Sequence, residues 1–463
     1  MEWILISSVL YILIAISIVV SLLLNGIRPS KTLAWLLAIF TIPVGGILLY
    51  LMIGRNRRKQ KSYSQHIRLP EPYPARISLK SKRMRQVEKL IETQTGYPLT
   101  GDNELELLKD GERTFRRIFE ALQAARETIH VQYYIFEEGV LADRLLELFV
   151  EKEAAGVEVR LIYDSIGSLS LSRAYLRRLR DAGIEAHNFL PYKFGRFLTS
   201  LNYRNHRKII VIDGKTAFTG GINISDKYLK GDRNLGLWRD MNLMIRGSAA
   251  HHLDTVFIND WELVSGIRLE IRAPVFPEIP GNQKVQILAS GPDDDFATME
   301  KLYFFLINNA RNHLYITNPY IIPSHAIMIA LHTAALSGVD VRLLLSEKAD
   351  STLVSWCVRS YFQRFLEAGI RIFLYPEGFL HSKVITVDDR ICTIGTANVD
   401  DRSFQHNYEV NAVVYQAETA TKLRKYFEAD CNASIELDYE SFSRRPLLHR
   451  LGEGAARTLS PLL

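Results

Sequence analysis

Apolar residues fill two long stretches at the start of the chain. Residues 3–24 and 32–53 contain no charged side chain. Each is long enough for a helix that crosses a bilayer, which needs about 20 apolar residues. The pattern therefore predicts an N-terminal two-helix transmembrane hairpin over residues 1–56. A cleaved signal peptide is the alternative for the first stretch, but its leading residues are acidic rather than basic. Pro43, Gly45 and Gly46 allow a kink or a re-entrant turn in the second.

Basic residues lie mainly on one side of this predicted hairpin. The cluster RNRRKQK at residues 55–61 follows the second stretch, whereas only Arg28 and Lys31 lie in the loop between the stretches. Because positive charge stays in the cytoplasm, we expect a multi-pass protein with both termini and all of the globular domains on the cytoplasmic side. The cluster should also contact an anionic membrane surface. We interpret residues 57–101 as a basic juxtamembrane connector.

From residue 102 the pattern changes to amphipathic helices that alternate with apolar strands. The segment RTFRRIFEALQAARETIHVQYYIF predicts a helix followed by a strand, and further helix–turn–strand units come after it. Such alternation is typical of an α/β protein with a mixed sheet flanked by helices. The second half of the chain replays the pattern. We therefore expect one domain at residues 102–270, a second at 271–435, and a basic amphipathic C-terminal tail at 436–463.

A set of polar residues occurs twice in this duplicated pattern. The segments NHRKIIVIDG and LHSKVITVDD each hold a His-x-Lys pair and an Asp, and a small-residue station that ends in Asn follows each. The paired positions, each 175 residues apart, are His206 and His381, Lys208 and Lys383, Asp213 and Asp388, and Asn223 and Asn398. The constant offset predicts two similar domains with a pseudo-two-fold relation, each of which supplies half of one shared site.

Composition limits the partners without choosing among them. The chain has 463 residues, of which 47% are hydrophobic and 23% charged, so it can bury sizeable cores. Its net charge of +6 suits nucleic acid, an acidic membrane surface or a phosphate-bearing substrate. The three cysteines, Cys357, Cys392 and Cys431, form no CxxC pair, which favours unpaired thiols in a reducing compartment.

The repeated residues have the chemistry of a phosphate site. Residues i and i+2 of a strand share a face, so His206 and Lys208 point the same way, whereas Asp213 has the opposite parity and is expected to give support. Two such clusters would place two histidines across one phosphate, where one attacks phosphorus and the other protonates the leaving oxygen. The lysines and asparagines would neutralise the remaining charge, so no metal is required. A single His-x-Lys strand could equally be a solvated sheet edge.

The double pattern HxKx4D, then six residues, then G[GST]xN, resembles the phospholipase D superfamily over residues 102–430. The resemblance implies a covalent phosphohistidine intermediate, with His206 as nucleophile and His381 as general acid and then base. The catalytic set that it implies is His206, Lys208, Asp213, His381, Lys383 and Asp388, with Asn223 and Asn398 as ligands of the substrate phosphate. In that superfamily an acidic residue downstream of each motif orients the histidine, and Asp240 in LWRDM and Glu409 in HNYEV fit that place.

The layout of the whole chain resembles the bacterial cardiolipin synthase family, including the segments QYYIF, SGPD and NPYIIP. That resemblance implies an enzyme of the bacterial inner membrane that needs no cofactor. It would transfer a phosphatidyl group from one phosphatidylglycerol to another, giving cardiolipin and glycerol, with no nucleic acid as partner. A membrane-tethered phospholipase that hydrolyses phospholipid is the alternative enzyme, and a non-catalytic protein that binds anionic lipid is the alternative class. Nothing in the pattern indicates the oligomeric state.

Two further segments each allow two interpretations. Residues 188–203, NFLPYKFGRFLTSLNY, mix aromatic and basic residues and suit a membrane interface, but an apolar loop packed on the core would look the same. The tail from Arg444 is either a basic amphipathic helix on the membrane or a helix docked on the protein.

Overall fold

The computed structural model describes residues 2–24, 29–50, 77, 79–189, 203–271, 281–294 and 297–460. The chain divides into two compact units, Met1–Gln60 with Pro191–Tyr203, and Lys61–Leu190 with Arg204–Leu463. The basic cluster at residues 55–61 and nearly all of the segment 188–203 lie outside the described residues, so the interpretations of both stay predictions.

In the described residues, the N-terminal unit forms the helices α1 (Glu2–Leu24), α2 (Pro29–Thr41) and α3 (Pro43–Leu49). The second apolar stretch is therefore two helices, because the chain leaves helical geometry at Ile42 and Pro43 restarts it at the first helical position. The Tyr11 hydroxyl donates to the Ile39 carbonyl at 2.9 Å. Within the described residues, no helix has both the length and the apolar character that crossing a membrane requires. The transmembrane hairpin stays a prediction.

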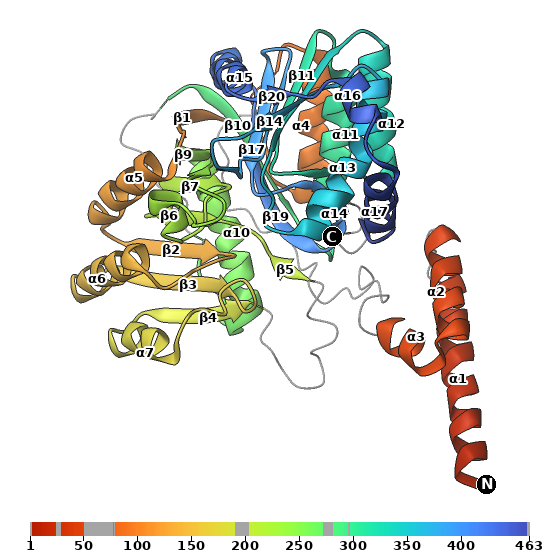
Figure 1. Cartoon of the computed structure of the whole chain (residues 1–463). Coiled ribbons are helices and arrows are strands. Elements are labelled where there is room, and N and C mark those ends of the chain that lie inside the picture. The colour runs from red at the N-terminus through yellow and green to blue at the C-terminus, as the bar shows by residue number, and fades with distance from the viewer. Residues whose placement is uncertain are drawn as a thin grey trace. The chain divides into compact units, whose positions relative to one another are not determined.

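The other unit is built on one mixed 16-stranded sheet to which both halves of the chain contribute (Figure 1). The second half supplies β20 (Ile435–Glu436), β14 (Arg371–Tyr375), β13 (Asp340–Ser346), β11 (His313–Thr317), β16 (Val384–Val387), β17 (Ile391–Gly395), β19 (Asn407–Val414) and β10 (Gln283–Ser290), in that spatial order. The first half continues with β1 (Thr100–Leu108), β9 (Asn242–Arg246), β7 (Thr216–Gly220), β6 (Ile209–Ile212), β2 (Thr128–Tyr133), β3 (Glu158–Asp164) and β4 (Glu185–Phe189).

Helices cover both faces of this sheet, as the alternating pattern predicts. On the first-half strands, α5 (Gly111–Gln123), α6 (Val140–Ala154) and α7 (Arg173–Asp181) lie on one face and α10 (Ser248–Ser265) on the other (Figure 1). On the second-half strands, α11 (Thr298–Asn309), α12 (His325–Leu336) and α13 (Thr352–Glu367) lie opposite α15 (Ala417–Asn432). The prediction of an α/β fold with two tandem domains is confirmed.

The halves meet where β1 pairs with β10 in antiparallel orientation, with Thr100 opposite Val285. Strand order is repeated outward from this junction, so β9, β7, β6 and β2 of the first half correspond to β19, β17, β16 and β11 of the second. A hydrophobic cluster crosses the junction: Leu253 and Val256 of α10 belong to the same core as Ala420 and Leu423 of α15. Burial of this shared apolar surface holds the halves together as one unit.

Residues at both ends of this unit also fold onto its core. Helix α4 (Lys82–Thr95) lies in the predicted connector, and its Val87 and Ile91 are buried in the core of the second half. In the predicted tail, α16 (Tyr439–Ser443) and α17 (Leu447–Thr458) contact α13. The three cysteines are buried free thiols, as the sequence predicts.

Candidate active site

Two short strand pairs carry the histidines across the boundary between the halves. Strand β5 (Arg204–Asn205) pairs with β19, and the next residue, His206, donates its backbone N–H to the Tyr408 carbonyl at 2.9 Å. Strand β15 (Phe379–Leu380) pairs with β8 (Trp238–Arg239), and His381 donates its backbone N–H to the Arg239 carbonyl at 2.7 Å. Each histidine is thus held beside the segment that bears the acidic residue of the other half.

The histidine–carboxylate contacts are exchanged between the halves. His206 Nδ1 lies 3.0 Å from both carboxylate oxygens of Glu409, and His381 Nδ1 lies 2.8 Å from Asp240 Oδ2. Both carboxylates are fully buried. A carboxylate on Nδ1 fixes the tautomer and leaves Nε2 of each ring for chemistry. The acidic residue downstream of each motif therefore contacts the histidine of the other motif.

The two lysines are buried next to the histidines. Lys208 Nζ donates to the His206 carbonyl at 2.9 Å and lies 5.6 Å from the centre of the Tyr134 ring, and Lys383 Nζ donates to the His381 carbonyl. Burial and the charge of Lys383 lower the pKa of Lys208 to about 7. Burial also lowers the pKa of Lys383 to about 8, although Asp240 and Glu409 oppose the shift.

The charges of the two half-sites act on each other. Burial lowers the pKa of His206 despite the opposing effect of Glu409, and the charge of Lys383 from the other half lowers it further. Burial and the charge of Lys383 lower the pKa of His381 to about 3. For Glu409, burial is outweighed by His206 and Lys208, which lower its pKa to about 2. Two carboxylates and at most two ammonium groups thus surround neutral imidazoles, and the repulsion that lowers the pKa of Lys208 would be relieved by an anionic ligand.

The asparagines of the repeated set lie buried in the same region, each next to a tyrosine. Asn223 Nδ2 is 3.3 Å from the Tyr228 hydroxyl, which in turn lies 3.2 Å from His381 Nδ1. Asn398 Nδ2 donates to the Tyr320 hydroxyl at 3.0 Å. Binding of phosphate by the asparagines stays a prediction.

Asp213 and Asp388 lie away from the histidines, at the other ends of β6 and β16. The Asp213 carboxylate accepts the backbone N–H groups of Glu127 and Thr128 at 2.8 and 2.9 Å. Asp388 accepts equivalent backbone N–H groups, including that of Asn312 at 2.7 Å. Their φ angles of 51° and 53° are left-handed, a conformation that Asp tolerates. We correct their placement in the catalytic set: they fix the start of β2 and β11 rather than contact the reacting groups.

The small residues after each strand make room for protein atoms. A Cβ on Gly221 would lie 2.2 Å from Asp240 Oδ1, so glycine lets this carboxylate approach the backbone. At the corresponding position Thr396 donates its hydroxyl to Glu409 Oε2 at 2.5 Å. The small residues at these positions thus admit the carboxylates that contact the histidines.

Sequence reasoning missed several residues that build the site. Arg207 has the parity opposite to His206 and Lys208, and its guanidinium contacts Asp260 at 2.6 Å. Asn411 supports the Thr396 station, because its Oδ1 accepts the Thr396 N–H at 3.2 Å. The signal for Asn411 was present: an Asn follows each acidic residue by two positions, at Asn242 and Asn411.

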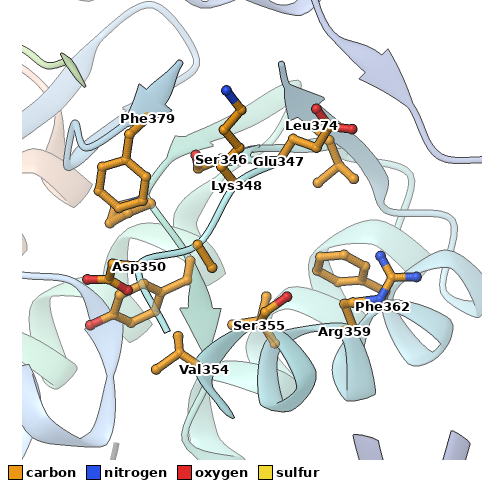
Figure 2. A pocket seen from close by; sticks show the side chains of 14 residues that line it. Ser346, Glu347, Lys348, Asp350, Val354, Ser355, Arg359, Phe362, Leu374 and Phe379 are labelled. Carbon is orange, nitrogen blue, oxygen red and sulfur yellow. The ribbon is translucent and has the colours of Figure 1, made fainter. Parts of the chain in front are cut away.

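A pocket adjoins the His381 side of the site (Figure 2). Its lining includes Tyr320, Lys348, Asp350, Ser355, Arg359 and Phe379. The Phe379 ring stacks on His381 with centroids 5.8 Å apart, and Tyr320 is the partner of Asn398, so two pocket residues also contact site residues. Charged, hydroxyl and aromatic groups together suit a polar headgroup. Among the described residues, no group of three or more His, Cys, Asp or Glu side chains is placed to hold a metal ion.

The duplicated α/β sheet supplies two histidines, each in contact with a carboxylate, and two buried lysines. These features define a phospholipase D-like protein. A family profile described as "Cardiolipin synthase, PLD-like domain" matches residues 118–261 and 303–431, and one described as "Phospholipase D-nuclease N-terminal" matches residues 9–55. The first covers more than half of the chain. The chain belongs to the cardiolipin synthase family.

Curated relatives and a solved structure agree with this placement. The chain is 39% identical to a cardiolipin synthase of Alkalihalophilus pseudofirmus, over 98% of this chain and 93% of the relative. It is 36% identical to the major cardiolipin synthase of Bacillus subtilis, over 94% of each chain. The crystal structure of a phosphatidylserine synthase from Haemophilus influenzae superposes with a TM-score of 0.61 at 14% identity, over 82% of this chain and all of that one. This last likeness concerns the fold alone.

Proposed function

We propose that the protein transfers a phosphatidyl group from one phosphatidylglycerol to a second, forming cardiolipin and releasing glycerol. The observation that carries this proposal is the exchanged pair of histidine–carboxylate contacts around two buried lysines. It provides a nucleophile, a second imidazole for proton transfer and two buried amino groups for one phosphodiester. Family membership supports the choice of lipid substrate.

In the first step, Nε2 of His206 attacks phosphorus and a P–N bond forms as the P–O bond to glycerol breaks. His381 gives its proton to the departing glycerol oxygen. The lowered pKa of His206 keeps its attacking nitrogen unprotonated, while Glu409 holds the proton on Nδ1. Burial and the charge of Lys383 lower the pKa of His381 to about 3 in the free site, and binding of the anionic phosphodiester would raise this pKa so that His381 can carry the proton.

In the second step, neutral His381 takes the proton from a hydroxyl of the second phosphatidylglycerol. That oxygen attacks phosphorus, the P–N bond breaks, and His206 leaves unchanged. We propose that the glycerol of this second lipid occupies the pocket beside His381, because the pocket offers hydroxyl and charged groups next to the proposed base. A lipid alcohol held there would compete with water, which favours transfer over hydrolysis.

The N-terminal unit is proposed to attach the enzyme to the inner membrane as a hairpin, with the catalytic unit in the cytoplasm and the basic cluster on anionic lipid. Large apolar side chains exposed on α1 and α2 support attachment: Ile6, Leu10, Leu13, Leu33 and Leu37 are each more than 50% exposed. The division into domains at residues 102–270 and 271–435, with a tail from 436, is part of the same proposal.

The direct test is to incubate the purified full chain with acyl-labelled phosphatidylglycerol in mixed micelles containing a metal chelator. We expect labelled cardiolipin and an equal amount of free glycerol. Phosphatidic acid as the sole labelled product would show that the protein is a hydrolase instead. A complete lack of turnover would contradict both the transferase and the hydrolase function.

A further inference from the structure

Helix α17 (Leu447–Thr458) turns a charged residue toward the protein and its leucines toward solvent. It packs on α13 through a face that includes buried Glu453 and Ala456. Glu453 is held there by Arg445 at 2.9 Å and by Arg359 at 3.4 Å. A helix on a globular protein normally turns its apolar stripe inward and its charges outward. Here an ion-paired carboxylate lies inside.

The leucines of α17 are exposed to solvent. Leu447, Leu448 and Leu451 are 68%, 79% and 60% exposed. Trp356 of α13, itself 48% exposed, packs against α17 so closely that a Cβ on Gly452 would lie 2.8 Å from its ring. We name these four residues, Leu447, Leu448, Leu451 and Trp356, the leucine surface. A cluster of exposed large apolar side chains is disfavoured in water and marks a surface that binds something apolar.

The charges around the leucine surface indicate what it binds. Residues 444–451, RRPLLHRL, contain three arginines and a histidine but no acidic residue. Arg444 and Arg450 are exposed, and the 3.4 Å contact of Arg444 with Glu440 joins two side chains about 80% exposed, which is a weak tie. Leucines flanked by cations, with an indole at the edge, match an interface of apolar acyl chains and anionic headgroups. A second copy of the same surface would bring like charges together.

Helix α13 connects this surface to the pocket beside His381. Val354, Ser355 and Arg359 of α13 line the pocket (Figure 2), while Trp356 of the same helix belongs to the leucine surface. A bilayer on the leucine surface would therefore lie next to the pocket that the acceptor lipid is proposed to use.

We propose that the leucine surface docks the catalytic unit on an anionic phospholipid bilayer, as a contact separate from the N-terminal helices. This inference rests on the proposed function in one respect: the bilayer is where a phosphatidylglycerol substrate lies. The contact would hold the catalytic unit at the depth where a headgroup reaches the pocket.

The docking itself is tested without catalysis. A Leu448→Cys variant of the full chain is labelled with an environment-sensitive fluorophore, the native cysteines being buried, and reconstituted in phosphatidylcholine vesicles with or without phosphatidylserine. We expect a blue shift and quenching by a lipid-borne quencher only with phosphatidylserine. The matched control is a label at Val140→Cys, a site on α6 that is 54% exposed, which should stay in water. Equal water exposure of both labels in phosphatidylserine vesicles would overturn the proposal.

A second measurement links docking to turnover. The double variant Leu448→Glu/Leu451→Glu should lose about tenfold activity on phosphatidylglycerol in vesicles and keep it on a short-chain, monomeric phosphatidylglycerol, while Val140→Glu loses neither. Undiminished vesicle activity, or an equal loss on both substrates, would count against docking. If the wild type forms no cardiolipin, the proposed function fails, yet the fluorophore result still decides whether this surface binds a bilayer.

Discussion

At the scale of single residues, each histidine depends on a carboxylate from the other half of the chain. Glu409 is 3.0 Å from His206 Nδ1 and Asp240 is 2.8 Å from His381 Nδ1. If His206 attacks and His381 supplies the proton, the two carboxylates affect different events. Glu409 then orients His206 for attack on phosphorus, and Asp240 orients His381 for proton transfer.

This assignment can be tested with a substrate whose leaving group needs no proton. We expect Glu409→Gln and Asp240→Asn each to lower kcat/KM on phosphatidylglycerol by about 10²- to 10⁴-fold. With phosphatidyl-p-nitrophenol, release of p-nitrophenolate should recover in Asp240→Asn and remain slow in Glu409→Gln. The reverse pattern would exchange the roles of the histidines.

The buried lysines predict how substrate binding depends on pH. Lys208 and Lys383 have pKa values lowered to about 7 and about 8, so both ammonium groups lose their protons as pH rises through that range. The phosphodiester stays anionic throughout, so KM for phosphatidylglycerol should rise by about tenfold between pH 7 and 9. A Lys208→Arg variant, which stays charged, should show a shallower rise. A wild-type KM that is constant over this range would contradict these pKa values.

At the scale of elements, the end of β6 shows why a repeated aspartate need not be catalytic. Asp213 follows the strand with a φ of 51° and accepts N–H groups at the start of β2, while His206 precedes the strand. A single carboxylate thus joins two neighbouring strands at one end of the sheet. Asp388 does the same for β16 and β11.

We expect Asp213→Ala to lower the free energy of unfolding by about 2–4 kcal/mol, because several backbone N–H groups lose an anionic acceptor. Asp213→Asn should lose less, and kcat of the folded fraction should be nearly unchanged in both. Urea denaturation and turnover measured on the same samples would separate the two effects. An Asp213→Ala protein of wild-type stability without activity would return Asp213 to the catalytic set.

At the scale of the whole molecule, one buried arginine adds to the contacts that join the two halves next to the site. Arg207 of the first half contacts Asp260 of α10 and donates to the Ser290 and Glu409 carbonyls of the second half. All of these groups are buried. Arg207 therefore positions the backbone of the carboxylate that contacts His206.

We predict that Arg207→Ala lowers the free energy of unfolding by about 3–5 kcal/mol, because Asp260 is left as an unpaired buried charge. The double variant Arg207→Met/Asp260→Leu should recover part of this loss, as measured by denaturant unfolding. It should still turn over slowly, since the hydrogen bond from Arg207 to the Glu409 carbonyl is lost. A double variant as unstable as Arg207→Ala would show that the charge pair is not the cause.

Much of this architecture could be read from the sequence. The constant offset between the motifs indicates two similar domains, and strand parity places His206 with Lys208. The exchange of Glu409 and Asp240 could not be predicted, because a symmetrical repeat does not say which half a side chain contacts. The role of Arg207 could not be predicted either. Its side chain points away from the histidine, into an interface that forms only when the two halves pack together. The exposure of the α17 leucines could not be predicted for the same reason, since a helical pattern does not show which face the rest of the protein covers.

The central claim is that a phosphatidyl group is carried on His206. The most direct measurement is rapid alkaline quenching of the enzyme with phosphatidyl-p-nitrophenol, followed by peptide mass spectrometry. We predict a phosphatidyl adduct on His206 in the wild type, its accumulation in His381→Ala, and its absence in His206→Ala. An adduct on His381, or cardiolipin formation that continues in His206→Ala, would contradict the account.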